Sequence, residues 1–131
     1  MSPRRLAVGV AFLWALALTG CDSGPSGPGS LMGSIQGPEP PAAALVLVTG
    51  EGIRDFQPVD GARLFWEPAG SATNSYRVLV IQMGEGSPEF QVQVEDLGSG
   101  RPTARVLELA DGSNQPVPDT DVDAYQVRFS R

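Results

Sequence analysis

The chain has 131 residues, no histidine, no lysine and one cysteine, and its nine arginines are outnumbered by fifteen acidic residues. These absences exclude Ser-His-Asp and Cys-His catalysis, zinc sites built on histidine or cysteine clusters, and any disulfide within the chain. An acidic chain without a basic cluster is also a poor partner for nucleic acid, so we expect none.

The first twenty residues have the pattern of an export signal. Arg4 and Arg5 begin it, and residues 6–18 form an apolar run without a charge. This run is shorter than the roughly 20 apolar residues of a helix that spans a bilayer. A basic start followed by a short apolar run is typical of a signal peptide, so we predict that residues 1–20 are removed.

The signal ends in Leu18-Thr19-Gly20-Cys21, which resembles the lipobox of bacterial lipoproteins. In that family the cysteine thiol forms a thioether to diacylglycerol, and the chain is cut just before the cysteine. The resemblance implies lipidation at Cys21 and an envelope protein anchored to the inner or the outer membrane. Asp22 resembles an inner-membrane retention signal, but this rule varies between lineages. The alternative is an ordinary secretory signal with a chance cysteine.

A short polar segment separates the anchor from the rest of the chain. After Cys21, residues 22–30 read Asp-Ser-Gly-Pro-Ser-Gly-Pro-Gly-Ser and offer no apolar side chain to bury. We therefore predict a flexible tether over residues 21–30. Residues 31–131 have the length of one small domain with a single core.

Strands dominate the predicted domain. Apolar and polar residues alternate with period two over 90–95 and 125–130, the pattern of half-buried strands. The runs 44–48 and 77–81 lack a polar face, which predicts strands that are covered on both sides or lie near the middle of a sheet. Weaker strands are predicted at 31–36, 62–66 and 105–110. About seven strands with short polar loops and no long helix predict an all-β domain, a small antiparallel two-sheet β-sandwich.

The order of these strands resembles the cohesin-type sandwich modules of secreted bacterial proteins. The resemblance lies in an early strand at 31–36, an Ala-rich apolar strand at 42–48, the runs 76–81 and 90–94, and a closing strand at 125–129. The chain is shorter than that family and lacks its Tyr-Asp pair after the second strand. The resemblance implies a protein-docking module, and no partner-binding residue is carried over.

Asp119, Asp121 and Asp123 place three carboxylates at alternate positions before the last strand. Calcium takes six to eight oxygen ligands, and loops often supply several of them in this spacing. The glycine of calcium-binding loops is missing here, since Ala124 and Tyr125 follow instead. A solvated acidic loop is therefore the favoured interpretation, and calcium is the alternative.

Trp66 and Tyr76 are the candidate ligand-binding aromatics. Flat rings stack on sugar faces, so these two residues suggest a carbohydrate site. Adjacent strand residues point to opposite faces, so only one of Phe65 and Trp66 can face the core. The favoured interpretation is that Trp66 caps the core or one end of the sandwich.

Together these features predict a non-enzymatic, lipid-anchored envelope protein that acts as a protein-binding or assembly module. It would contact the membrane through Cys21, have an envelope protein as partner and require no cofactor. A carbohydrate-binding module is the alternative, followed by a hydrolase that uses two carboxylates.

Overall fold

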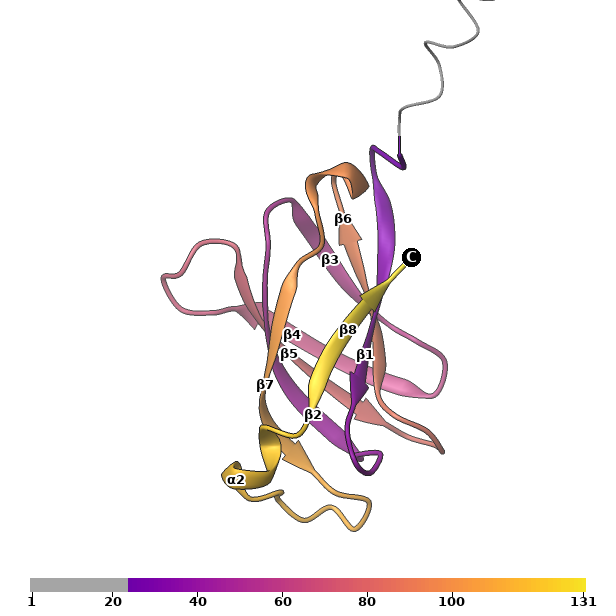
Figure 1. Ribbon diagram of the computed structural model, residues 1–131, viewed down its shortest axis with the longest axis vertical. Coiled ribbons are helices and arrows are strands. Elements are labelled where there is room, and N and C mark those ends of the chain that lie inside the picture. The colour runs from indigo at the N-terminus through magenta and orange to yellow at the C-terminus, as the bar shows by residue number, and fades with distance from the viewer. Residues whose placement is uncertain (1–23) are drawn as a thin grey trace, which may run out of the picture.

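The computed structural model describes residues 24–131, so the predicted signal peptide and Cys21 lie outside the described residues. Figure 1 shows the described part as an elongated sandwich of strands. The strands are β1 (Gly29–Gln36), β2 (Ala43–Thr49), β3 (Ile53–Pro58), β4 (Ala62–Pro68), β5 (Ser75–Gln82), β6 (Glu89–Val94), β7 (Thr103–Ala110) and β8 (Gln126–Ser130). Two short helical turns accompany them, η1 (Leu97–Ser99) and α2 (Asp119–Val122). No helix within residues 24–131 is long and apolar enough to span a membrane.

The predicted fold class is confirmed. Sheet A has the strand order β3-β6-β1-β8 and sheet B the order β4-β5-β2-β7, and every described pairing is antiparallel. Among the described strands, β4 and β5 are the one consecutive pair that lies side by side in a sheet. All other connections cross from one sheet to the other, so strand partners are distant in sequence.

The eighth strand, β3, was not predicted. A register shift lies between Ile53 and Asp55 where β3 pairs with β6. This bulge inserts one residue, so Ile53 and Phe56 both pack on the core although they are three residues apart. The alternation of apolar and polar residues that marks a strand is interrupted at the bulge. The sequence pattern therefore did not predict β3.

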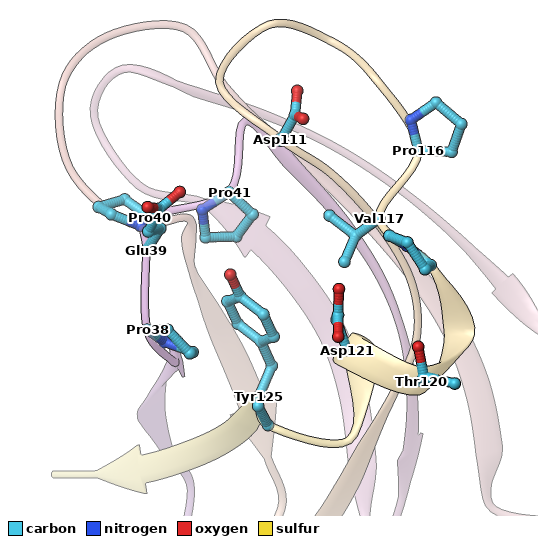
Figure 2. Close-up of a pocket in the computed structure, with 12 residues that line it drawn as sticks. Pro38, Glu39, Pro40, Pro41, Asp111, Pro116, Val117, Thr120, Asp121 and Tyr125 are labelled. Atoms are coloured by element: carbon cyan, nitrogen blue, oxygen red, sulfur yellow. The ribbon is translucent and has the colours of Figure 1, made fainter.

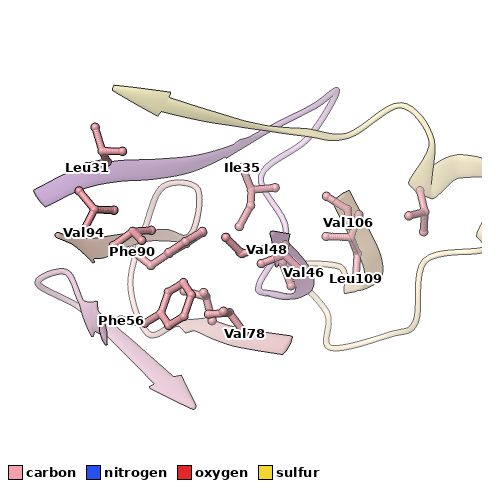
Figure 3. Close-up of a cluster of buried hydrophobic side chains, with 14 residues drawn as sticks. Leu31, Ile35, Val46, Val48, Phe56, Val78, Phe90, Val94, Val106 and Leu109 are labelled. Atoms are coloured by element: carbon pink, nitrogen blue, oxygen red, sulfur yellow. The ribbon is translucent and has the colours of Figure 1, made fainter. Parts of the chain in front are cut away.

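The core lies between the two sheets and is made of the inward-facing residues of both. Its buried members are Leu31, Ile35, Ala44, Val46, Val48, Phe56, Val78, Val80, Phe90, Val92, Val94, Val106, Leu109 and Val122 (Figure 3). All of them are apolar. Within the described region, every buried side-chain nitrogen or oxygen has a hydrogen-bond partner. Because the buried residues and the partly buried residues packed against them all lie within residues 31–129, we expect residues 24–131 to fold as a unit.

The two predicted central strands are neighbours in the middle of sheet B. β5 pairs with β2 over seven residues, and the edge strands β4 and β7 flank this pair. Val46, Val48, Val78 and Val80 point inward and are fully buried. The opposite face of the same strands is also apolar.

The start of the domain differs from the predicted boundary. β1 begins at Gly29, because Gly29 and Ser30 continue the ladder to Val94 and Gln93 of β6. Further upstream, the carbonyl oxygen of Gly27 accepts a hydrogen bond from the backbone N–H of Leu97 at 2.8 Å. The segment predicted as a flexible tether is thus bound to the domain from Gly27 onward.

Asp96 is the residue that secures this attachment. Its carboxylate accepts hydrogen bonds from the backbone N–H of Gly98 (2.8 Å), the backbone N–H of Gly27 (2.9 Å) and the hydroxyl of Ser99 (3.2 Å). These donors, the Gly98 N–H first, lower the pKa of Asp96 below its usual value. The negative charge is therefore favoured in the folded state.

We expect Asp96→Asn to lower the free energy of unfolding above about pH 4, where the aspartate of the unfolded chain (pKa about 3.9) is ionised. A folded-state pKa below the unfolded value gives stabilisation that is fully present above the unfolded pKa. That stabilisation disappears as the pH falls through the folded pKa. Urea denaturation from about pH 7 down to about pH 2 measures the effect.

Glu85→Gln is the matched control for this experiment, since it removes one negative charge from an exposed loop. The gap between Asp96→Asn and the unchanged chain should close in acid, whereas the control should follow the unchanged chain throughout. Parallel pH curves for the Asp96 variant and the unchanged chain would contradict the assignment.

Candidate functional site

The outer faces of the two sheets differ in chemistry. On sheet A the outward positions of β1 and β6 are mostly serine, glutamine and glutamate, with Met32 as their one large apolar side chain. The neighbouring strands β3 and β8 add Asp55, Gln57, Gln126, Arg128 and Ser130. This is the polar, hydrated face expected of one side of a sandwich.

The outer face of sheet B is apolar in its middle. Three rows of outward side chains cross the strands in the order β4, β5, β2, β7, and the register pairs them as Arg63-Ile81-Ala43-Ala110, Phe65-Leu79-Leu45-Glu108 and Glu67-Arg77-Leu47-Arg105. We call the outward apolar residues of β4, β5 and β2, namely Ala43, Leu45, Leu47, Phe65, Leu79 and Ile81, the apolar face. None of them belongs to the core cluster between the sheets or packs against it.

The apolar face is accessible within the described region. The Phe65 side chain is 59% exposed, and Leu45, Leu47, Leu79 and Ile81 are half-buried by their neighbours in the sheet. Two shallow hollows adjoin on this face and share Leu45 and Leu79. One, of about 320 Å³, extends towards Phe65 and Arg77, and the other, of about 270 Å³, extends towards Glu108 and Pro116. Contiguous apolar surface of this kind marks interaction sites in soluble domains.

Charges of both signs surround the apolar face. Arg63 and Glu67 lie on the edge strand β4, Arg105 and Glu108 on the opposite edge strand β7, and Arg77 lies on β5. Arg77 and Glu67 form an exposed ion pair with an N–O distance of 3.7 Å. Such a pair contributes little to stability in water, but it orients two charges beside the face.

The candidate sugar-binding residues, Trp66 and Tyr76, lie in contact with each other and with the ring of Phe56. The Trp66 and Tyr76 ring centroids are 5.7 Å apart in an edge-to-face arrangement, and Phe56 of the unpredicted strand β3 lies 5.2 Å from Trp66 and 5.6 Å from Tyr76. Trp66 points inward, while its neighbour Phe65 points outward. The rings contact one another through edges and tilted faces, so they do not form one flat platform. Trp66 keeps 39% of its surface exposed at the rim of the core.

The three candidate calcium ligands lie on and just after a helical turn instead of in an open loop. Asp119 and Asp121 belong to α2 and Asp123 follows it, and all three are exposed. Residues two apart on a helix point in different directions, and buried Val122 fixes the turn against the core. No group of three acidic side chains within residues 24–131 is placed to hold a metal ion.

A separate cavity of about 380 Å³ lies beside α2, at the end of the sandwich opposite to the start of β1 (Figures 1 and 2). Its walls are Pro38, Glu39, Pro40, Pro41, Asp111, Pro116, Val117, Pro118, Thr120, Asp121, Ala124 and Tyr125. The Tyr125 ring packs directly against Gly37, where a larger residue would displace it. One oxygen of Asp111 accepts the backbone N–H groups of Ser113 and Gln115, both at 2.9 Å, so this carboxylate holds its own loop together.

Sequence reasoning identified the strands of the apolar face but not the face itself. The unbroken apolar runs at 44–48 and 77–81 left two interpretations open, a strand covered on both sides or a central strand. The strands are central, and their outer apolar side chains are half-buried and lie outside the core cluster. The apolar face could have been predicted from Phe65, because a strand residue next to an inward-facing Trp66 must face outward.

Comparison of the chain with protein-family models, with curated proteins and with solved structures gives no match.

Proposed function

We propose that the protein is a non-enzymatic, lipid-anchored module of the bacterial cell envelope, and that it binds protein through the outer face of sheet B. The observation that carries this proposal is the apolar face, set in a domain whose other sheet has a polar outer face. A β-sandwich needs one apolar side on each sheet for its core. Sheet B has two, so the second requires another explanation, and protein contact is the usual one.

The anchor and the domain would work together in this function. Lipid on Cys21 would restrict the domain to the membrane surface, and the few residues before Gly27 would set its reach. Confinement raises the effective concentration of a binding module for partners on the same surface. Weak contacts through a small face are then sufficient for assembly.

The two alternative functions have less support. Carbohydrate binding would need exposed rings in one plane, whereas Trp66 and Tyr76 meet edge to face. A hydrolase would need two free carboxyl groups in a cleft, whereas the Asp111 carboxylate beside α2 is engaged by two backbone N–H groups. Neither arrangement is specific enough to stand as a second proposal.

The test is chemical cross-linking of the lipidated protein in intact envelopes. We expect discrete cross-linked products for the unchanged chain, identified by mass spectrometry, and their loss in the double variant Leu45→Glu/Phe65→Glu. Both substitutions introduce charge on the apolar face and leave the core residues in place. Each charge would have to be desolvated on binding, so the products should decrease by about tenfold or more.

Gln91→Glu/Gln93→Glu is the matched control, because it adds the same two charges to the outer face of sheet A. Circular dichroism of each variant establishes that the fold is retained. Products that persist in the sheet B variant, or that vanish equally in the control, would refute the apolar face as the binding surface.

A further inference from the structure

We infer that the occupant of the apolar face is a second copy of this chain, in a twofold dimer that packs sheet B against sheet B. The inference rests on the proposed function and specifies its partner. Three features of the face support it: the distribution of charge over the domain, the arrangement of charges around the rim, and the position of the chain start.

Like-charge repulsion between two copies is weak across the outer face of sheet B. Residues 24–131 contain seven arginines and fourteen acidic side chains. The outer face of sheet B has three of the arginines, Arg63, Arg77 and Arg105, and two of the acids, Glu67 and Glu108. The remaining surface keeps four arginines and twelve acids. Two copies therefore repel each other through most contacts, whereas the outer face of sheet B has a nearly balanced charge.

The rim charges are complementary under a twofold axis parallel to the strands. A twofold axis parallel to the strands, between β5 and β2, places each β4 opposite the other copy's β7. Glu67 then faces Arg105 of the second copy in the same row, and this pair occurs twice. Arg63 faces Ala110 of the second copy, about 7 Å along the strand from Glu108. At the centre, Leu79 faces Leu45 and Ile81 faces Ala43 of the second copy. Phe65 faces Glu108 and Arg77 faces Leu47, so the apolar contact is concentrated in the two central strands.

The packing angle of two sheets does not remove these pairs. Face-to-face sheets lie about 10 Å apart, with strands rotated by about 30°. Such a rotation moves rim residues sideways by a few ångströms, which the long side chains of arginine and glutamate can span. An axis across the strands would also pair Arg63 with Glu67 of the second copy, but it would place Glu108 opposite Glu108 of the second copy, where like charges repel.

The same axis also agrees with attachment to one membrane. The start of β1 and the α2 turn lie at opposite ends of the sandwich, and β2 and β7 extend between those ends (Figure 1). Rotation about an axis along the strands leaves both chain starts at the same end. Both anchors would then reach one membrane, whereas an axis across the strands would point them in opposite directions.

The size of the face predicts weak association in solution. Four strands at about 4.8 Å spacing and seven residues at about 3.3 Å give a footprint of about 19 Å by 23 Å. Standard interfaces bury about 800 Å² on each partner, and this footprint is roughly half of that as a flat area. We therefore expect a monomer–dimer equilibrium in solution that shifts towards dimer when the protein is confined on a membrane.

Sedimentation equilibrium of residues 24–131 at low salt, up to about 500 µM, measures the dimer. Glu67→Arg and Arg105→Glu should each weaken dimerisation by about tenfold or more, because each replaces two attractions by two repulsions. The double variant Glu67→Arg/Arg105→Glu restores opposite charges and should regain most of the affinity. Glu89→Arg on the outer face of sheet A makes the same change of charge as Glu67→Arg and should not weaken the dimer.

The outcomes separate this inference from the proposed function. A dimer that follows the charge-swap pattern supports both. A monomer at every concentration, with no dimer cross-linked in vesicles that hold the lipidated protein, overturns the inference. If another envelope protein is nevertheless cross-linked through Leu45 and Phe65, the binding module stands with a different occupant. A dimer in which the double variant is no better than the single variants overturns the proposed symmetry.

Discussion

Phe90→Ala is expected to lower the free energy of unfolding by about 3–5 kcal/mol, the usual result of truncating a fully buried aromatic residue. Phe90 is 0% exposed and lies on β6, at the centre of sheet A between β3 and β1. Its ring contacts Phe56 with centroids 6.3 Å apart and Phe129 with centroids 6.2 Å apart. Alanine would remove these contacts and leave a cavity between the two sheets.

The surroundings of Phe90 cannot close over such a cavity easily. Gly33 of β1 lies so close to the ring that a Cβ atom there would be 2.6 Å from Cζ of Phe90. The glycine therefore provides the space that the ring fills, and no side chain is present to move in when the ring is lost. For a domain whose total stability is about 5–15 kcal/mol, this loss would leave little reserve.

Urea or thermal unfolding of residues 24–131 measures the change, with Phe65→Ala as the matched control. The control removes the same ring from a side chain that is 59% exposed, so we expect less than about 1 kcal/mol. The comparison is made at low protein concentration, where the proposed dimer does not form. Equal losses for the two variants would contradict the described core.

Cys21→Ser is expected to abolish lipid attachment at residue 21 and the cut that follows it, so the variant should keep residues 1–20. Serine has no thiol and cannot form the thioether to diacylglycerol that the lipobox resemblance implies. Each buried methylene contributes about 0.8 kcal/mol to membrane binding, so the two acyl chains would provide almost all of the membrane affinity of the processed, unchanged chain. The variant loses no disulfide, because the chain has no second cysteine.

The measurement is fractionation of cells into membrane and soluble parts, with mass spectrometry of the N-terminus. The unchanged chain should begin at a lipid-modified Cys21 and remain with the membranes. Ser99→Cys provides a control chain that keeps Cys21 and gains an exposed thiol. A soluble, unmodified N-terminus in the unchanged chain would refute the lipoprotein assignment. The ordinary secretory signal would then be the better interpretation.

The sequence alone determined the fold class, most of the strands and the chemistry that is absent. Alternation of apolar and polar residues at 90–95 and 125–130 shows that each strand has one buried and one solvated side. This property can be read from the strand's own residues, whichever strands lie beside it. The same logic placed Phe65 and Trp66 on opposite faces. Missing residue types excluded histidine-based catalysis and disulfides, because no fold can supply a side chain that the chain lacks.

The tertiary structure decided what local patterns could not. A bulge concealed β3, and with it Phe56, the ring that engages Trp66 and Tyr76. A buried Val122 turned the acidic segment into α2, so Asp119, Asp121 and Asp123 diverge.

The apolar face also depends on pairings between strands that are distant in sequence. An apolar run shows that both sides of a strand avoid water, but not what covers them. Here all but one connection between consecutive strands cross between the sheets, so each residue's neighbours come from distant parts of the chain. Those distant pairings placed Leu45 beside Leu79 and left both side chains half-buried, outside the core between the sheets.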